Sequence, residues 1–299
     1  MDLRIGMEEV NKLVNASPRL VSSRPRRLNI EKRIQKVRIQ LRSEINQTMQ
    51  PWAFLLDECV RFYIYFSELQ WTVKFDKARS TFAMEIGRLR SLSISIRELV
   101  HLGQESAAYA LARVFLDDLE LTGVIIIDPD FALKYMNEDE DHDVEKFWKQ
   151  NIGYGRIYPK YNAFLTASGW SNSNSTSEIK LHKELKNILS GHVHPSPAST
   201  FRGLAYPSWV YPGKFAIKSL GHLTIHIHQL CLMIAQQTQN VSACIINLMI
   251  KEKPPFVLSN YRRGSVLQNV LASAFVLQSL LSSYEDDLQA EYERICEIN

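Results

Sequence analysis

The sequence predicts an all-α protein, and three observations lead to that prediction. Glycine and proline are scarce, at 12 and 11 of 299 residues, while 45% of the residues are hydrophobic. Several long segments repeat apolar residues every three or four positions, which is the spacing of amphipathic helices. Few segments alternate apolar and polar residues between turn signals, as the strands of all-β proteins do. A chain of this length and apolar content is long enough to bury a large core.

The N-terminal part, residues 1–48, is expected to form a basic helical arm, ahead of a single helical domain over residues 49–299. Residues 1–46 hold eleven Lys and Arg against five Asp and Glu, an excess of six positive charges, although the whole chain carries only +3. Helical spacing is shown by Ile30, Ile34, Val37 and Leu41. The basic residues are candidates to bind nucleic acid or an acidic partner protein, and the alternative is a solvated helix face. These candidates are Arg24, Arg26, Arg27, Lys32, Arg33, Lys36, Arg38 and Arg42.

Helical patterns continue along the domain. They cover residues 51–71, 78–101, 104–127, 177–190, 214–250 and 265–295. The first of these helices begins with Pro51, and its aromatic residues are expected in the core. The second and third are separated near Gly103 and predict an antiparallel pair. Loops are expected at the acidic run 137–145, the Ser/Asn-rich run 168–177 and the proline-rich run 195–212, and Gly191 is expected to end a helix in the left-handed conformation.

The cysteines and the N-terminus predict a cytoplasmic protein without a membrane anchor. The four cysteines lie far apart and show no Cys-x-x-Cys spacing, so we expect buried thiols rather than disulfides or a zinc knuckle. The first ten residues, MDLRIGMEEV, lack the apolar segment of a signal peptide. No run approaches 18 uninterrupted apolar residues.

The segment LSGHVHPS, residues 189–196, opens a histidine-rich region. Five of the eight histidines lie between residues 192 and 228, and no Asp or Glu occurs from residue 185 to residue 251, so an anion would be favoured there. If their segment is helical, His222 and His226 share a face and could complete a three-histidine metal site with His192 or His194, whereas a strand would put His226 and His228 on one face. Structural histidines are the competing interpretation for the helix pair, and no metal or cofactor is expected.

His192 and His194 follow a helical segment, and two roles remain open for them. The helix dipole raises the pKa of a histidine at a helix C-terminus, which suits a general base acting on a ribose 2′-hydroxyl or a general acid acting on a leaving oxygen. Capping the helix end is the other role.

One family resemblance bears on these alternatives. The helical stretch RSLSISIRELVHLGQESAAYALARVFLDDLELTGVIII, followed by a helix ending in LSGHVHPS, resembles the bacterial helical family catalogued as domain of unknown function 5677, a distant relative of the HEPN superfamily. The resemblance spans about residues 80–245. It implies an α-helical bundle, a homodimer, and membership of a superfamily rich in metal-independent ribonucleases of toxin–antitoxin and anti-phage systems.

The resemblance also implies an active site of an Arg followed by four to six residues and a His, and this chain departs from that pattern. The interval from Arg97 to His101 is too short, and the nearest imitations are Lys186 or Asn187 with His192. Lysine lacks the planar fork of a guanidinium. Arg113, in the family-like segment LARVF, and Arg202, in the acid-free region, are candidates to supply the missing charge.

Two functions follow as hypotheses. The first is a defence or toxin-type protein that acts on RNA as a metal-independent ribonuclease. Its catalytic candidates are His192, His194, Lys186, Asn187, Arg113 and Arg202. The second is a non-catalytic sensor or scaffold of an anti-phage or toxin–antitoxin system that binds a partner protein or nucleic acid through the basic arm.

Overall fold

The computed structural model describes residues 30–48, 50–70, 77–140, 144–193, 227–251 and 265–297. No strand occurs in these ranges, which confirms the predicted all-α class. The helices are α2 (Ile30–Thr48), α3 (Gln50–Gln70), α4 (Lys77–His101), α5 (Glu105–Ile127), α6 (Pro129–Glu140), α7 (Val144–Asn151), the 3-10 helix η1 (Gly153–Gly155), α8 (Tyr158–Ala167), α9 (Asn172–Val193), α11 (Ile227–Ile250) and α12 (Ser265–Glu297). The chain divides into two units, Met1–Lys36 and Val37–Asn299, and the packing below is that of the second.

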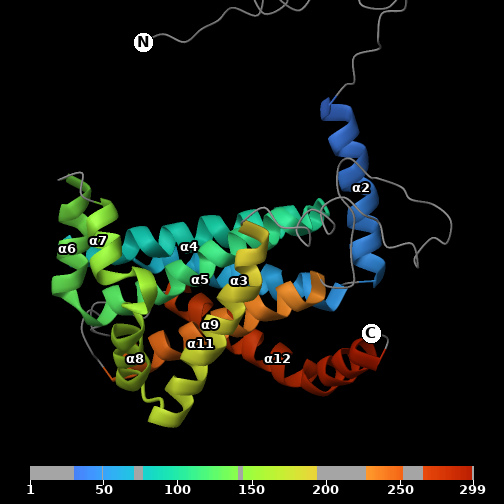
Figure 1. The fold of residues 1–299 in the computed structure, drawn as a ribbon. Helices are drawn as coiled ribbons and strands as arrows, with labels where there is room; N and C mark the ends of the chain where they lie inside the picture. The colour runs from blue at the N-terminus through green and yellow to red at the C-terminus, as the bar shows by residue number, and fades with distance from the viewer. Residues whose placement is uncertain are drawn as a thin grey trace, which may run out of the picture. The chain divides into compact units, whose positions relative to one another are not determined.

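Helix α5 is the centre of this packing. Of its 23 residues, 15 are buried, and they include every residue from Asp118 to Ile126, as expected of a segment covered by other helices on all sides. It packs against α4, α6, α8, α9 and α11, while α12 packs mainly along α3. Figure 1 shows α4 and α5 lying side by side, as the sequence predicts, with α6 and α7 at one end of the pair.

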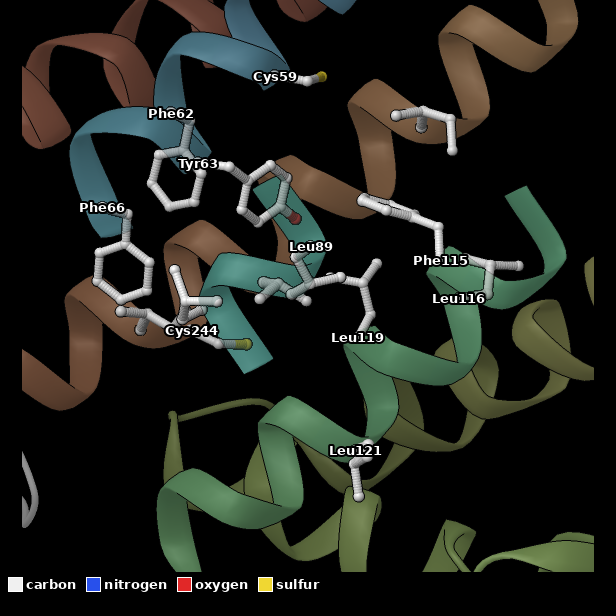
Figure 2. Close-up of a cluster of buried hydrophobic side chains, with 14 of the residues drawn as sticks. Cys59, Phe62, Tyr63, Phe66, Leu89, Phe115, Leu116, Leu119, Leu121 and Cys244 are labelled. Carbon is white, nitrogen blue, oxygen red and sulfur yellow. The ribbon is translucent and has the colours of Figure 1, made fainter. Parts of the chain in front are cut away.

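The aromatic residues of α3 form much of the core, as Figure 2 shows. Phe62 and Phe66 are fully buried and stack on each other at 5.5 Å, and Tyr63 meets Phe115 of α5 edge to face at 5.8 Å. These contacts confirm the predicted core role of most α3 aromatics. Phe54 differs, because 41% of it is exposed and the guanidinium of Arg61 covers its ring at 6.0 Å.

Three of the four cysteines are buried and free, as the sequence predicts. They are Cys59, Cys231 and Cys244. Burial raises the pKa of each thiol, to about 12 for Cys59 and Cys244. A thiol with so high a pKa is protonated at neutral pH, which makes these three side chains ordinary apolar groups of the core.

Gly103 ends α4 and allows α5 to fold back along it. Its φ of 63° is left-handed, its N–H donates to the Val100 carbonyl at 3.0 Å, and the next N–H, of Gln104, donates to the Leu99 carbonyl at 2.8 Å. This pair of bonds is the Schellman motif that satisfies the last carbonyls of a helix. The predicted break near Gly103 is therefore confirmed, together with its physical reason.

Two predictions about α9 were wrong. The Ser/Asn-rich run 168–177, expected as a loop, already enters the helix at Asn172, because the Ser171 hydroxyl accepts the N–H of Asn174 at 3.3 Å and caps the first turn. Gly191 does not stop the helix, which continues to Val193, and it is not among the described glycines with positive φ. His192 is therefore a helical residue.

Other predicted segments fall partly or wholly outside the described residues. The acidic run 137–145 is helical up to Glu140 and again from Val144, so it is not one continuous loop. The proline-rich run 195–212 and the start of the helix predicted over 214–250 lie outside the described ranges. The last helix begins at Ser265, as predicted.

One described helix, α12, is long and apolar enough over Val266–Ser283 to cross a membrane by length and composition alone. Its residues Val270, Ala274 and Leu277 are buried against the rest of the protein, whereas 72% of Phe275 is exposed.

Candidate functional site

A network of buried polar and charged side chains lies where α9 packs on α5 and contacts α11. This network, called the buried seam below, consists of Glu120, Glu178, His182 and Gln237. Glu120, His182 and Gln237 are almost wholly buried there. His182 Nδ1 lies 2.9 Å from a Glu120 oxygen, and Nε2 lies 2.5 Å from the Gln237 side-chain oxygen and 3.3 Å from Glu178. The Glu178 carboxylate also accepts the Asn240 amide at 2.9 Å. One histidine thus joins α5, α9 and α11.

The carboxylates of the buried seam determine the protonation state of His182. Burial alone would lower the pKa of His182, but its hydrogen bonds and ion pairs with Glu120 and Glu178 outweigh burial and raise that pKa to about 9. In the same way, the bond from His182 lowers the pKa of Glu178 despite its burial. At neutral pH the ring is therefore an imidazolium with both N–H groups engaged. It acts as a structural cation and cannot accept a proton there.

Two of the predicted catalytic residues meet at the outer part of this seam. The Lys186 ammonium lies 2.7 Å from one oxygen of Asp117 and also pairs with Glu120, while Arg113 donates to the other oxygen of Asp117. Lys186 is 7% exposed. Burial alone would lower its pKa, but Glu120 and Asp117 have the larger effect and raise that pKa, so the ammonium stays charged. Both cations are neutralised by carboxylates of α5, which limits what they offer to a phosphate.

The remaining predicted catalytic residues are separated from one another. His192 lies in the last turn of α9, where its ring stacks on Tyr109 of α5 at 4.5 Å with an interplanar angle of 18°. Asn187 lies on another face of α9, where it lines a cleft beside α8. His194 and Arg202 lie outside the described residues, as do His222 and His226.

A basic pocket, missed as a site in the sequence, lies between α2 and α4. It has a volume of about 120 Å³ and is lined by Arg38, Arg42, Arg97, Glu98 and His101. Glu98 receives Arg38 at 3.0 Å and Arg97 at 2.9 Å, and Arg97 also donates to Asp57 of α3. Among the ion pairs of the described residues, none involves Arg42, which is exposed.

The electrostatics of the basic pocket favour an anion. Three guanidinium groups meet two carboxylates, which leaves one positive charge even with a neutral histidine. Asp57 and Glu98 raise the pKa of Arg97 although burial opposes them, so the guanidinium is fixed in its charged form. His101 is 9% exposed, and its Nδ1 lies 2.8 Å from the Arg97 carbonyl oxygen. That contact is satisfied when Nδ1 carries the proton, which leaves Nε2 as an acceptor.

Two of the basic residues predicted to bind a partner line the basic pocket, and the others lie elsewhere. Arg38 and Arg42 line it, Lys32 and Lys36 are exposed on α2, and Arg33 is a helical residue of α2. Arg24, Arg26 and Arg27 lie outside the described residues. A sequence signal for the pocket exists, since Arg97 and His101 are one helical turn apart, but sequence does not show that α2 brings two more arginines to them.

No group of three or more His, Cys, Asp or Glu side chains in the described ranges is arranged to hold a metal ion. Comparison of the chain with protein-family models, with curated proteins and with solved structures found no match.

Proposed function

We propose that the protein acts on RNA and holds a backbone phosphate in the basic pocket of Arg38, Arg42, Arg97, Glu98 and His101. The observation that carries this proposal is the convergence of three guanidinium groups and one imidazole on a cavity of about 120 Å³. Guanidinium groups bind phosphate oxygens through two parallel hydrogen bonds, and a pocket with net positive charge attracts the nucleic-acid backbone.

In this proposal the same pocket supplies a base and positive charge for metal-independent cleavage of RNA. His101 would take the proton of the ribose 2′-hydroxyl, the 2′-oxygen would attack phosphorus, and the bond to the 5′-oxygen would break as solvent protonates that oxygen. Arg97 and Arg42 would stabilise the negative charge that develops on the phosphoryl oxygens. The products would be a 2′,3′-cyclic phosphate and a 5′-hydroxyl. The HEPN-like resemblance supports this reaction class, a homodimer and a place in a cytoplasmic defence or toxin–antitoxin system. The pair Arg97 and His101 itself does not have the Arg–His interval that the resemblance implies.

A second catalytic arrangement remains proposed, with His192 and His194 as the acid and base. It is supported by the place of His192 in the last turn of α9, where the helix dipole favours a charged imidazole. Arg113 lies one turn of α5 after Tyr109, whose ring stacks on His192.

A non-catalytic sensor or scaffold is the second candidate function, and the ion pairs favour it. Arg38 and Arg97 already have carboxylate partners, as do Lys186 and Arg113. A phosphate would have to compete with Glu98 and Asp57 for its guanidinium contacts. Such a pocket suits reversible binding of RNA or of an acidic partner protein without cleavage.

Incubation of the purified protein with total cellular RNA in EDTA tests these alternatives. The wild type is compared with His101→Ala and with the double variant His192→Ala/His194→Ala, and RNA ends are analysed for 2′,3′-cyclic phosphate. Loss of cyclic ends only in His101→Ala supports cleavage in the basic pocket, and loss only in the double variant assigns cleavage to the end of α9. Intact RNA with the wild type, together with RNA binding, supports the non-catalytic candidate.

A further inference from the structure

A second hollow, the α8–α9 cleft, is independent of the basic pocket. It has a volume of about 700 Å³ and lies between α8, α9 and the turn at η1. The side chains that matter for its chemistry are Tyr154, Tyr158, Asn162, Thr176, Lys183 and Asn187. None of its described lining residues is Asp or Glu. The volume is within the range of small-molecule sites, and the lining combines aromatic rings, one cation and neutral hydrogen-bonding groups.

Tyr154 stands at the edge of the α8–α9 cleft in an unusual conformation. Its φ of 58° is left-handed, which side chains other than glycine rarely adopt, and 80% of the residue is exposed. The turn is held by Trp148, whose ring meets Tyr154 edge to face at 5.8 Å and leaves no room for a Cβ atom at Gly153, where it would lie 2.5 Å from Trp148. The Tyr154 ring is therefore exposed to solvent, while Trp148 packs against the backbone of the turn.

Tyr158 forms the aromatic wall of the cleft next to two ammonium groups. Lys183 Nζ lies 4.7 Å and Lys186 Nζ 5.4 Å from the centre of its ring. Lys186 is committed to Asp117 and Glu120 in the buried seam, whereas Lys183 is exposed and lines the cleft. Among the lining residues of the cleft, the cation available to a ligand is therefore Lys183. The exposed guanidinium of Arg156 lies beside the cleft, 5.9 Å from the centre of the Tyr154 ring.

We infer that the α8–α9 cleft binds a nucleoside monophosphate unit, with the base against Tyr154 and Tyr158 and the phosphate at Lys183. Aromatic side chains stack on bases, lysine neutralises one phosphate, and the amides of Asn162 and Asn187 offer donors and acceptors to a base edge. A cleft lined by carboxylates would instead repel the phosphate. This site goes beyond the proposed function, because it lies on other helices than the basic pocket and requires no cleavage.

The unit has two sources, a free nucleotide or one nucleotide of an RNA strand, and binding measurements distinguish them. Full-length protein is titrated with AMP by calorimetry and with a fluorescein-labelled six-nucleotide oligoadenylate by anisotropy. Saturable AMP binding that displaces the oligonucleotide supports a free nucleotide as ligand, and binding of the oligonucleotide alone supports a strand.

Variants connect the binding to the cleft. Tyr154→Gly removes the ring and relieves the left-handed strain, so the turn keeps its backbone, and Lys183→Gln removes an exposed charge. Tyr154→Gly is expected to weaken binding roughly tenfold, as loss of one stacked base does. Lys183→Gln is expected to weaken it several-fold, as loss of one phosphate contact does. Lys180→Gln, an exposed lysine on the same helix outside the cleft, is the matched control and is expected to bind within about twofold of wild type.

The inference is overturned if neither AMP nor the oligonucleotide binds saturably, or if Tyr154→Gly and Lys183→Gln both bind like the wild type. Arg42→Gln separates this site from the basic pocket. AMP binding that survives Arg42→Gln and is lost in Tyr154→Gly supports the cleft even where the protein cleaves no RNA. Failure of the proposed RNA function and failure of this inference therefore give different results.

Discussion

Replacing His182 by glutamine should destabilise the folded protein at neutral pH. At pH 9 the loss of stability should be much smaller. The imidazolium is buried between Glu120 at 2.9 Å and Glu178 at 3.3 Å. Its pKa is raised from 6.5 to about 9 on folding. A group whose pKa is raised in the folded state stabilises fully below its unfolded pKa and loses that contribution as pH rises through the folded pKa.

The magnitude follows from the two pKa values. Because one pKa unit corresponds to about 1.4 kcal/mol, protonation of His182 contributes roughly 2–3 kcal/mol at pH 7 and less than about 1 kcal/mol at pH 9. Glutamine keeps hydrogen-bonding capacity but carries no charge, so the difference between wild type and His182→Gln should shrink by about 2 kcal/mol between these pH values. Comparing the two proteins removes the contributions of the titrating groups that do not interact with His182.

Urea unfolding followed by far-UV circular dichroism at pH 6, 7 and 9 measures this difference. The matched control is Lys180→Gln on the same helix, where the lysine side chain is 78% exposed and its Nζ lies 3.9 Å from Glu184. Its effect should stay below about 0.5 kcal/mol at each pH. An equal loss of stability for His182→Gln at pH 7 and pH 9 would refute the assignment of a buried imidazolium.

The further predictions concern packing at two glycines and the buried carboxylate of Asp118. Gly123→Ala would place a Cβ 2.8 Å from the Phe164 ring and should cost about 1–3 kcal/mol of unfolding free energy, whereas Gly191→Ala, with open space in a helix, should gain up to about 1 kcal/mol in the same urea assay. Burial raises the pKa of Asp118 from 3.8 to about 7 despite Arg88 at 2.6 Å, so ionisation of this carboxyl costs stability that is lost progressively from about pH 4 and fully above about pH 7. Asp118→Asn should therefore gain more stability relative to wild type at pH 8 than at pH 5, and an equal effect at both pH values would contradict this.

The helical framework follows from apolar spacing, because long amphipathic or buried helices leave a strong periodic signal. The break at Gly103 was also predictable, because the two helical patterns are separated there and only glycine adopts the left-handed turn without strain. The start of α9 was not, because serine and asparagine favour both loops and helix caps, and the choice is made by the Ser171 cap and by the packing of the rest of the helix on α5.

The candidate sites were less accessible to sequence. Lys186 and Arg113 were identified as isolated charges, but their meeting at Asp117 depends on the rotation of α9 against α5. A retrospective signal is the spacing of Glu178, His182 and Lys186, which places three charged groups on one face of a helix that also carries apolar residues. The basic pocket depends on a contact between α2 and α4 that no local pattern encodes.

RNA binding by the basic pocket is the central proposal, and the salt dependence of that binding tests it most directly. The dissociation constant of a ten-nucleotide RNA is determined over a series of salt concentrations for wild type, Arg42→Gln and the control Lys180→Gln. Loss of one phosphate contact predicts several-fold weaker binding by Arg42→Gln and a salt slope smaller by roughly 0.7–1. A slope and affinity equal to those of the wild type would contradict phosphate binding at this pocket.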